Sequence, residues 1–286
     1  MIPAAFDYVR AGSLREALNA IAAGDGGTKV LAGGHSLIPM MRFRLAQPER
    51  LVDIGALDEL RGVAEQRRGA RIGALTTYRD ILDSELLRER YRILAECTAT
   101  IGDTQVRNRG TIGGGLAHAD PASDMPAVML ALDASFTLRS KGGKRAVKAR
   151  EFFKGPFETE LRPDELLIEI VLPPLPTGAG SAYVTHEQAA SGYALAAAAA
   201  VVGRSRKTIN HAVLALTGLA NGARLVEGAE QLVGTRGEPD AIARVAGSAA
   251  EGQEVSGDIH APADYRRHLL GVASREALTL ALERAR

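Results

Sequence analysis

The segment that most constrains the fold is an apolar strand, residues 28–34 (TKVLAGG), which runs directly into a helical segment, residues 36–45 (SLIPMMRFRL). A second apolar strand follows over residues 49–54 (ERLVDI). Strand, helix and strand within about 30 residues form a parallel crossover unit. A helix predicted over residues 13–23 (SLREALNAIAA) precedes it. We therefore expect a first subdomain over about residues 1–55.

The first strand ends in Gly33 and Gly34, followed by His35 and Ser36. Glycine in a strand fills no space, but it permits positive φ and a close approach to the backbone. Ser36 is placed to cap the helix, whose start offers unpaired N–H groups to an anion. The segment has neither a P-loop lysine nor a Gly-x-Gly-x-x-Gly spacing. It fits a phosphate cradle or a tight turn that binds nothing.

A second glycine-dense segment, residues 110–115 (GTIGGG), is expected to precede a helix whose start is marked by Asp124 and Pro126. Two glycine loops that can bind anions suit a ligand with a pyrophosphate and a polar tail, such as a dinucleotide. Between the loop and the helix, polar side chains are available to bind hydroxyl groups: His118, Asp120, Ser123 and Asp124. Asp124 is equally suited to be a helix N-cap. Arg107 and Arg109 either pair with phosphate or are solvated surface charges.

The rest of the chain mixes strands and helices, which predicts an α+β fold. Strands are expected at GARIGAL, ASFTLRS and ELLIEIVLP, and a helix around residues 81–98. The proline-rich residues 172–180 (LPPLPTGAG) are typical of a linker. Beyond it we expect a third part with two apolar segments, residues 193–203 and 209–220, and two terminal helices.

Composition excludes several classes of function. The formal net charge of +1 gives no basis for binding nucleic acid or an anionic membrane. One cysteine, Cys97, rules out an internal disulfide and an iron–sulfur cluster held by this chain alone. His35 and His118 lack partners at metal-ligand spacing, and no nucleophile motif is present. Without a signal peptide or an apolar segment of about 20 residues, the chain is expected to be cytoplasmic.

Two segments, residues 32–54 (AGGHSLIPMMRFRLAQPERLVDI) and 107–127 (RNRGTIGGGLAHADPASDMPA), resemble the FAD-binding medium subunit of the molybdenum hydroxylases. This is the family of aerobic carbon monoxide dehydrogenase and xanthine dehydrogenase. Residues 257–282 are similar to its C-terminal domain, so the resemblance covers the whole chain. It implies a vanillyl-alcohol-oxidase-type (PCMH) FAD-binding domain over residues 1–175, with subdomains 1–55 and 56–175. A C-terminal α+β domain would span residues 176–286.

The resemblance also implies which residues contact FAD. They are Ala32, Gly33, Gly34, His35, Ser36, Leu37, Ile101, Thr111, Ile112, Gly113, Gly114, His118, Asp124, Leu167 and Tyr193. The two loops would bind the pyrophosphate, and Asp124 would hold ribityl or ribose hydroxyls. Ile101 and Leu167 would line the flavin. Tyr193 would shield one face of the isoalloxazine; its alternative is a buried tyrosine that begins an alanine-rich segment.

The implied function is electron transfer, with no catalytic residue and no metal ligand in this chain. Electrons would come from the [2Fe-2S] clusters of a small partner subunit, while a large partner subunit would hold molybdopterin. The assembly would be a dimer of heterotrimers, with any membrane association made through the partners. Two alternatives stay open: a self-sufficient FAD-dependent reductase or oxidase of the same fold, and a scaffold subunit that has lost its flavin.

Two positions depart from the family's pattern. Gly115 stands where asparagine or serine is more usual. The segment HEQAASGY, residues 186–193, has no lysine or arginine before the aromatic residue. His186 is the candidate to replace the absent basic side chain near the polar edge of the flavin.

Overall fold

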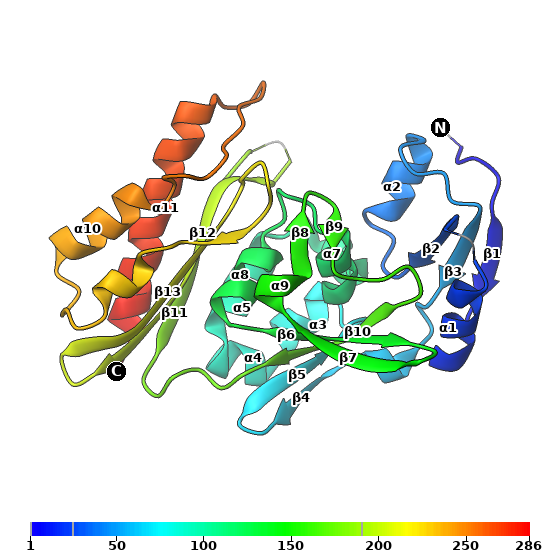
Figure 1. The fold of residues 1–286 in the computed structure, drawn as a ribbon, viewed down its shortest axis with the longest axis horizontal. Helices are drawn as coiled ribbons and strands as arrows, with labels where there is room; N and C mark the ends of the chain where they lie inside the picture. The colour runs from blue at the N-terminus through cyan, green and yellow to red at the C-terminus, as the bar shows by residue number, and fades with distance from the viewer. Residues whose placement is uncertain (1, 25, 190) are drawn as a thin grey trace.

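The computed structural model describes residues 2–24, 26–189 and 191–286. Three units follow one another along the long axis of the molecule, in the order of the chain (Figure 1). Each is built on its own sheet: 3 parallel strands in the first unit, 5 antiparallel strands in the second and 4 antiparallel strands in the third. The predicted mixture of helices and sheets is confirmed.

The first unit has strand order β1-β3-β2. Its elements are β1 (Asp7–Arg10), α1 (Leu14–Ala22), β2 (Thr28–Leu31), α2 (Leu37–Arg42) and β3 (Arg50–Asp53). The predicted crossover is present, since β2 and β3 pair in parallel, and β1 adds a strand that the sequence did not predict. Helix α2 is shorter than the expected 36–45, because Arg44 adopts a left-handed φ of 59° that stops it. Ser36 precedes α2, but its side chain makes no capping hydrogen bond.

The second unit packs helices against a sheet with strand order β4-β5-β10-β6-β7. Its strands are β4 (Val63–Gln66), β5 (Gly69–Gly73), β6 (Ser135–Ser140), β7 (Gly143–Lys148) and β10 (Leu166–Leu172), with a hairpin of β8 (Phe153–Gly155) and β9 (Glu158–Thr159). Its helices are η1 (Asp58–Leu60), α3 (Tyr78–Asp83), α4 (Glu85–Arg90), α5 (Arg92–Thr100), α6 (Thr104–Arg109), α7 (Ile112–His118), α8 (Met125–Ala131) and α9 (Ala149–Phe152).

The single helix predicted around residues 81–98 is wrong. Three helices occupy this stretch, because extended backbone at Ser84 and another non-helical conformation at Tyr91 interrupt it. The Ser84 side chain accepts a hydrogen bond from the Leu87 amide and so begins α4 anew. Helix α3 begins with a capping box of Thr77 and Asp80, which fixes where this helix starts.

The third unit is a sheet with two helices against it. Its elements are β11 (Gly180–Glu187), β12 (Ala194–Ser205), β13 (Thr208–Thr217), β14 (Arg224–Leu225), η2 (Ala229–Leu232), α10 (Pro239–Ser248) and α11 (Ala263–Arg284). Figure 1 shows α10 and α11 on one side of the sheet and the second unit on the other. None of the helices in the described ranges combines the length and the apolar character that crossing a membrane requires.

Strand β12 is buried on both faces. Ala197, Ala199 and Val201 belong to the core shared with the second unit, whereas Ala196 and Ala198 belong to the core under α11. Successive side chains of a strand point to opposite faces, so the alanine run supplies two cores at once. The second and third units are therefore packed against each other through a continuous apolar interior.

Candidate functional site

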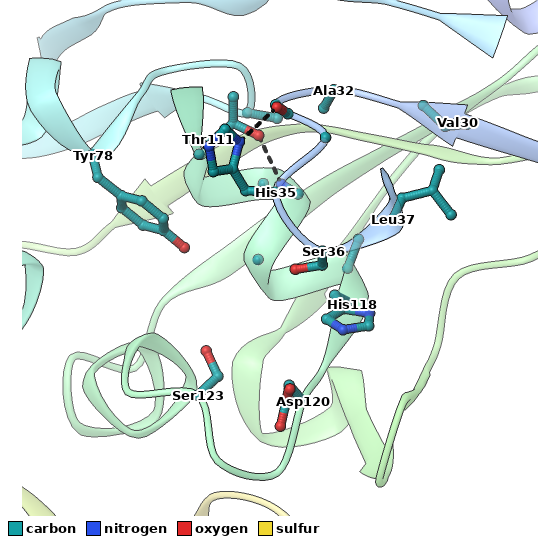
Figure 2. A pocket seen from close by; sticks show the side chains of 18 of the residues that line it. Val30, Ala32, His35, Ser36, Leu37, Tyr78, Thr111, His118, Asp120 and Ser123 are labelled. Carbon is teal, nitrogen blue, oxygen red and sulfur yellow. Dashed lines mark hydrogen bonds between the residues drawn. The ribbon is translucent and has the colours of Figure 1, made fainter. Parts of the chain in front are cut away.

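A cleft of about 600 Å³ opens where the units meet (Figure 2). This volume is typical of ligand and cofactor sites. The predicted contact residues that line it are Ala32, Gly33, Gly34, His35, Ser36, Leu37, Ile101, Thr111, Gly113, Gly114, His118, Asp124, Leu167 and Tyr193. Ile112 is not among the lining residues: its side chain is fully buried in the core of the second unit. The structure thus brings nearly the whole predicted set to one cleft.

The first glycine loop presents free backbone donors to the cleft. Within the described part of the chain, nothing accepts a hydrogen bond from the consecutive amides of residues 33–37. Gly34 adopts a left-handed φ of 78°, as expected. Successive amides around a left-handed residue form a concave site for anions. This loop is therefore the part of the cleft best suited to bind an anion.

Gly33 is needed for a different reason from the expected positive φ. Its φ is not left-handed, but a Cβ added there would lie 2.1 Å from the Arg109 carbonyl oxygen. The first loop thus passes directly against the chain that leads into the second glycine segment. Only a residue without a side chain allows this contact, which closes one end of the cleft.

The second glycine segment is not a loop ahead of the helix at residue 125, as expected, but the first turn of α7. The Thr111 hydroxyl accepts a hydrogen bond from the Gly114 amide at 3.3 Å and caps the helix. The Ile112 and Gly113 amides donate to two carbonyls of the turn that follows β5, those of Thr76 and Ala74. These amides are already paired, so this segment shapes the cleft wall and leaves the free donors to the first loop.

Asp124 does not cap α8. Its side chain makes no capping hydrogen bond, and the residue is 7% exposed. Its carboxylate accepts a short hydrogen bond from the hydroxyl of Tyr183, on β11 of the third unit. Burial raises the pKa of Asp124 to about 6, against the lowering effect of the Tyr183 hydrogen bond. The cap interpretation is wrong, and Asp124 is a buried acceptor at the cleft wall.

Arg107 has a structural task. Its guanidinium donates to the carbonyls of Ala99, Ile101 and Gly102, which fixes the turn that carries Ile101 to the cleft. Arg109 is exposed and is not a lining residue. Neither arginine is placed as a phosphate ligand among the residues that line the cleft.

Tyr193 stands at the cleft with 53% of its surface exposed, so it is not the buried tyrosine of the alternative interpretation. Gln188 fixes the turn before it: its amide donates to the Tyr193 carbonyl at 2.8 Å, and its side chain accepts from the Ser191 amide. Partial burial raises the pKa of Tyr193, with smaller contributions from Asp120 and Asp124. Of the divergent segment 186–193, Ala190 lies outside the described residues.

His186 does not replace the absent basic side chain. It lies on β11, outside the cleft lining, and its Nε2 is buried without a partner among the described residues. The β11–β12 pairing places His186 opposite Ala196 and away from the cleft-facing turn.

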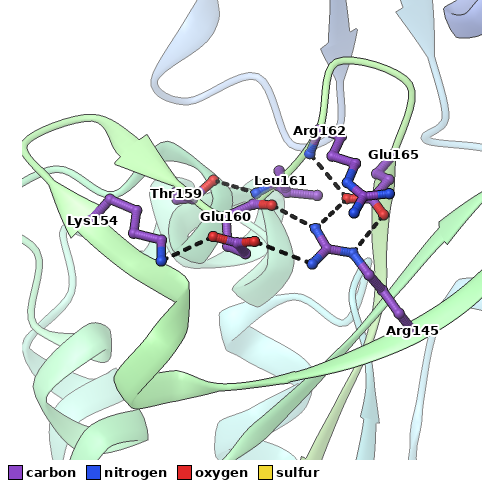
Figure 3. Close-up of polar contacts among 7 residues, drawn as sticks. All are labelled: Arg145, Lys154, Thr159, Glu160, Leu161, Arg162 and Glu165. Carbon is purple, nitrogen blue, oxygen red and sulfur yellow. Dashed lines mark hydrogen bonds and ion pairs between the residues drawn. The ribbon is translucent and has the colours of Figure 1, made fainter.

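Several residues that line the cleft were not predicted. One of them, Glu165, is held by a network of hydrogen bonds and ion pairs. The Arg145 guanidinium on β7 donates to both Glu165 carboxylate oxygens at 2.8 Å, and Lys154 pairs with Glu160 (Figure 3). The hydrogen bonds from Arg145 lower the pKa of Glu165. Glu165 precedes β10 directly, so the network anchors the start of the strand that carries Leu167. No sequence motif marks it, because its members come from separate elements.

Tyr78, the first residue of α3, is a second unpredicted lining residue. Its ring is buried, and its hydroxyl points into the cleft (Figure 2). No group of three or more histidine, cysteine, aspartate or glutamate side chains suited to a metal occurs within the described ranges. The cleft thus offers free amides, hydroxyl groups, apolar walls and the buried carboxylate of Asp124, while the buried carboxylate of Glu165 is paired with Arg145.

A cleft between a parallel β–α–β subdomain and an antiparallel subdomain, with anion-binding amides at one end, is the site of a dinucleotide-binding protein. Comparison with known proteins identifies which family of dinucleotide-binding proteins this is. Residues 4–175 match the FAD binding domain in molybdopterin dehydrogenase, and residues 181–281 match the CO dehydrogenase flavoprotein C-terminal domain. The chain therefore belongs to the family of FAD-binding medium subunits of molybdopterin dehydrogenases.

Relatives match along the whole chain. The carbon monoxide dehydrogenase medium chain of Hydrogenophaga pseudoflava is 39% identical over 99% of both chains. The glyceraldehyde dehydrogenase medium chain of Sulfolobus acidocaldarius is 40% identical over 97% of this chain and 98% of that one. Among solved structures, carbon monoxide dehydrogenase from H. pseudoflava superposes with a TM-score of 0.97, over all of both chains. Quinoline 2-oxidoreductase from Pseudomonas putida 86 is 31% identical, with a TM-score of 0.93 over 99% of both.

These matches confirm the predicted family, its FAD-binding fold and its C-terminal domain, and the class of oxidoreductase flavoprotein subunits. The residues present fit FAD. The free amides of residues 33–37 suit a pyrophosphate, and buried Asp124 suits a hydroxyl of the cofactor. The volume of the cleft and its apolar lining by Ile101 and Leu167 suit a ring system.

Proposed function

We propose that this chain binds FAD in the cleft and passes electrons from the [2Fe-2S] clusters of a small partner subunit to an external acceptor. The observation that carries the FAD part is the row of unpaired amides at residues 33–37, which lines the cleft and suits an anion. FAD, when bound, supplies an acceptor that can take up and release electrons. The chain's own residues then have binding and shielding tasks only.

Each part of the cleft has one of these tasks. The first loop holds the pyrophosphate through its amides, while Gly34 provides the left-handed turn. Asp124 accepts a hydrogen bond from a ribityl or ribose hydroxyl and is itself oriented by Tyr183. Ile101 and Leu167 form an apolar wall, and Tyr193 covers the flavin from the third unit. No side chain has to move a proton during electron transfer.

The proposed assembly is a dimer of heterotrimers in the cytoplasm. The small subunit contributes the iron–sulfur clusters and the large subunit holds molybdopterin, where the substrate is oxidised. The free Cys97 of this chain is fully buried in the core, so it is not placed to ligate iron. We also propose a domain boundary near residue 175, between β10 and β11.

Purification of the native complex and of this chain alone tests the function. We expect the chain to release FAD on denaturation and the complex to contain iron and molybdenum. A chain without flavin, purified from a complex that holds iron and molybdenum, would indicate the scaffold alternative. Substrate turnover by the chain alone would indicate the self-sufficient enzyme.

Tyr193→Ala should increase the rate at which oxygen reoxidises the dithionite-reduced flavoprotein. An aromatic ring over the flavin excludes water and oxygen, and this ring stands at the mouth of the cleft. We expect a rate increase of about tenfold and a shifted flavin absorption spectrum, with FAD still bound. Stopped-flow absorbance measures both. An unchanged rate and spectrum would show that Tyr193 does not contact the flavin; Tyr265→Ala, at an exposed tyrosine of α11 outside the cleft lining, is the control.

A further inference from the structure

We infer that Tyr78 is an FAD-binding residue whose hydroxyl, seated over Gly115, donates a hydrogen bond to an oxygen of the ribityl–pyrophosphate region. The inference rests on the proposed function, because it assigns a further ligand to the same cleft. Three observations support it: the way the ring is held, the space above Gly115, and the absence of a protein partner for the hydroxyl.

The ring of Tyr78 is held rigidly at the cleft. The capping box of Thr77 and Asp80 sets the start of α3, and the Tyr78 amide donates to the Gly110 carbonyl at 3.0 Å. Tyr78 is 6% exposed. A Cβ on Gly110 would lie 3.0 Å from the ring edge, so the ring packs directly on that glycine. The hydroxyl therefore has a fixed position, and Figure 2 shows it directed into the cleft.

Gly115 leaves the space that this hydroxyl occupies. A Cβ added to Gly115 would lie 2.3 Å from the Tyr78 hydroxyl oxygen but 3.6 Å from the ring carbon that bears it. Gly115 lies inside α7 and has no left-handed φ, so its backbone conformation does not call for glycine. Glycine destabilises a helix interior relative to alanine. The space that the Tyr78 hydroxyl needs explains why residue 115 is glycine.

The hydroxyl lacks a partner in the protein. Throughout residues 2–24, 26–189 and 191–286, no group forms a hydrogen bond with it. Burial raises the pKa of Tyr78, so the hydroxyl keeps its proton and remains a donor. The hydroxyl is not sealed in the core, because Tyr78 opens onto the cleft, where solvent reaches this oxygen. An FAD oxygen in the cleft replaces water as the acceptor of its hydrogen bond.

The test compares FAD affinity and apoprotein melting temperature across three variants. Tyr78→Phe keeps the ring and removes the donor, so we expect FAD affinity to fall about 3- to 15-fold with no loss of apoprotein melting temperature. Gly115→Ser alone places its Cβ against the hydroxyl, so melting temperature and FAD affinity both fall. In Tyr78→Phe/Gly115→Ser, the serine fits over the ring, which restores the melting temperature and recovers part of the FAD affinity. Flavin fluorescence titration and thermal denaturation provide these measurements.

Tyr91→Phe is the matched control. The Tyr91 ring is also buried, but its hydroxyl donates to the Pro173 carbonyl at 2.7 Å, outside the cleft lining. This variant should lower the melting temperature and leave FAD affinity unchanged. Wild-type affinity in Tyr78→Phe, or effects that simply add in the double variant, would overturn the role of Tyr78. A wild-type chain that binds no FAD would instead overturn the proposed function.

Discussion

Gly34→Val abolishes FAD binding, with an affinity loss that we expect to exceed 100-fold. Valine is strained at the φ of 78° that Gly34 adopts. To relieve this strain the loop changes conformation, and the amides of residues 33–37 then no longer point to one place. Each hydrogen bond to a charged phosphate oxygen contributes about 1.5–3 kcal/mol, so the loss of two accounts for that factor. The added Cβ also lies 2.7 Å from the Ile38 side chain, which must shift. FAD content after purification and titration of the apoprotein measure the effect.

Gly252→Val is the control that distinguishes loss of FAD binding from the effect of backbone strain alone. Gly252 has a similar φ of 71°, and nothing lies within 4 Å of a Cβ there. It is not a lining residue of the cleft. Both valine variants should lower the melting temperature of the apoprotein, Gly34→Val by more because of the Ile38 contact, and only Gly34→Val should lose FAD. Normal FAD content in Gly34→Val would show that the first loop does not bind the pyrophosphate.

Asp124→Asn should weaken FAD binding about 10- to 100-fold at pH 8, because a charged acceptor of the ribityl or ribose hydroxyl becomes neutral. The same change should raise the melting temperature of the apoprotein at that pH. Burial raises the pKa of Asp124 to about 6 in the folded chain, so folding favours its protonated form. The contribution of this proton to the stability of the wild-type fold is complete below about pH 4, and it is lost as the pH rises through 6.

The melting temperatures of Asp124→Asn and wild type should therefore converge near pH 4 and separate above pH 6. Wild-type FAD affinity should fall on acidification through pH 6, and the affinity of the variant should vary less. Thermal denaturation of the apoproteins and FAD titrations at several pH values measure these differences. Asp133→Asn is the control, since Asp133 is half-buried, pairs with Lys148 and lies outside the cleft lining. A pH-independent difference in melting temperature would contradict a titrating Asp124.

The sequence could predict the parts of the fold that depend on local pattern. The crossover of β2, α2 and β3 followed from two short apolar runs around a helical segment, and the two glycine segments pointed to a dinucleotide. Nearly all of the residues that the family resemblance selected line the cleft. Ile112 was the exception, since its amide donates to the Thr76 carbonyl and its side chain is buried in the core.

The tasks of individual residues depended on contacts between distant elements. Gly33 is glycine because of the Arg109 carbonyl, and the first two amides of α7 are paired with carbonyls of the turn after β5. Asp124 has the position of a helix cap, but its carboxylate accepts a hydrogen bond from Tyr183, 59 residues away in the sequence. The Arg145 network draws on three separate segments. Such pairings leave no periodic or local signal in a single sequence.

The alanine run of β12 affects how the pairing register of this strand is determined. A displacement by two residues would put alanine on alanine in both cores, so side-chain packing along the run distinguishes poorly between registers. The irregularities in pairing lie at the two ends, between His186 and Glu187 and between Gly203 and Arg204. Bulges of this kind fix alignment. A two-residue slip would carry Tyr193 about 6–7 Å along the strand direction, away from the cleft. The location of the ring is therefore encoded at the far end of the strand as well as in the turn beside it.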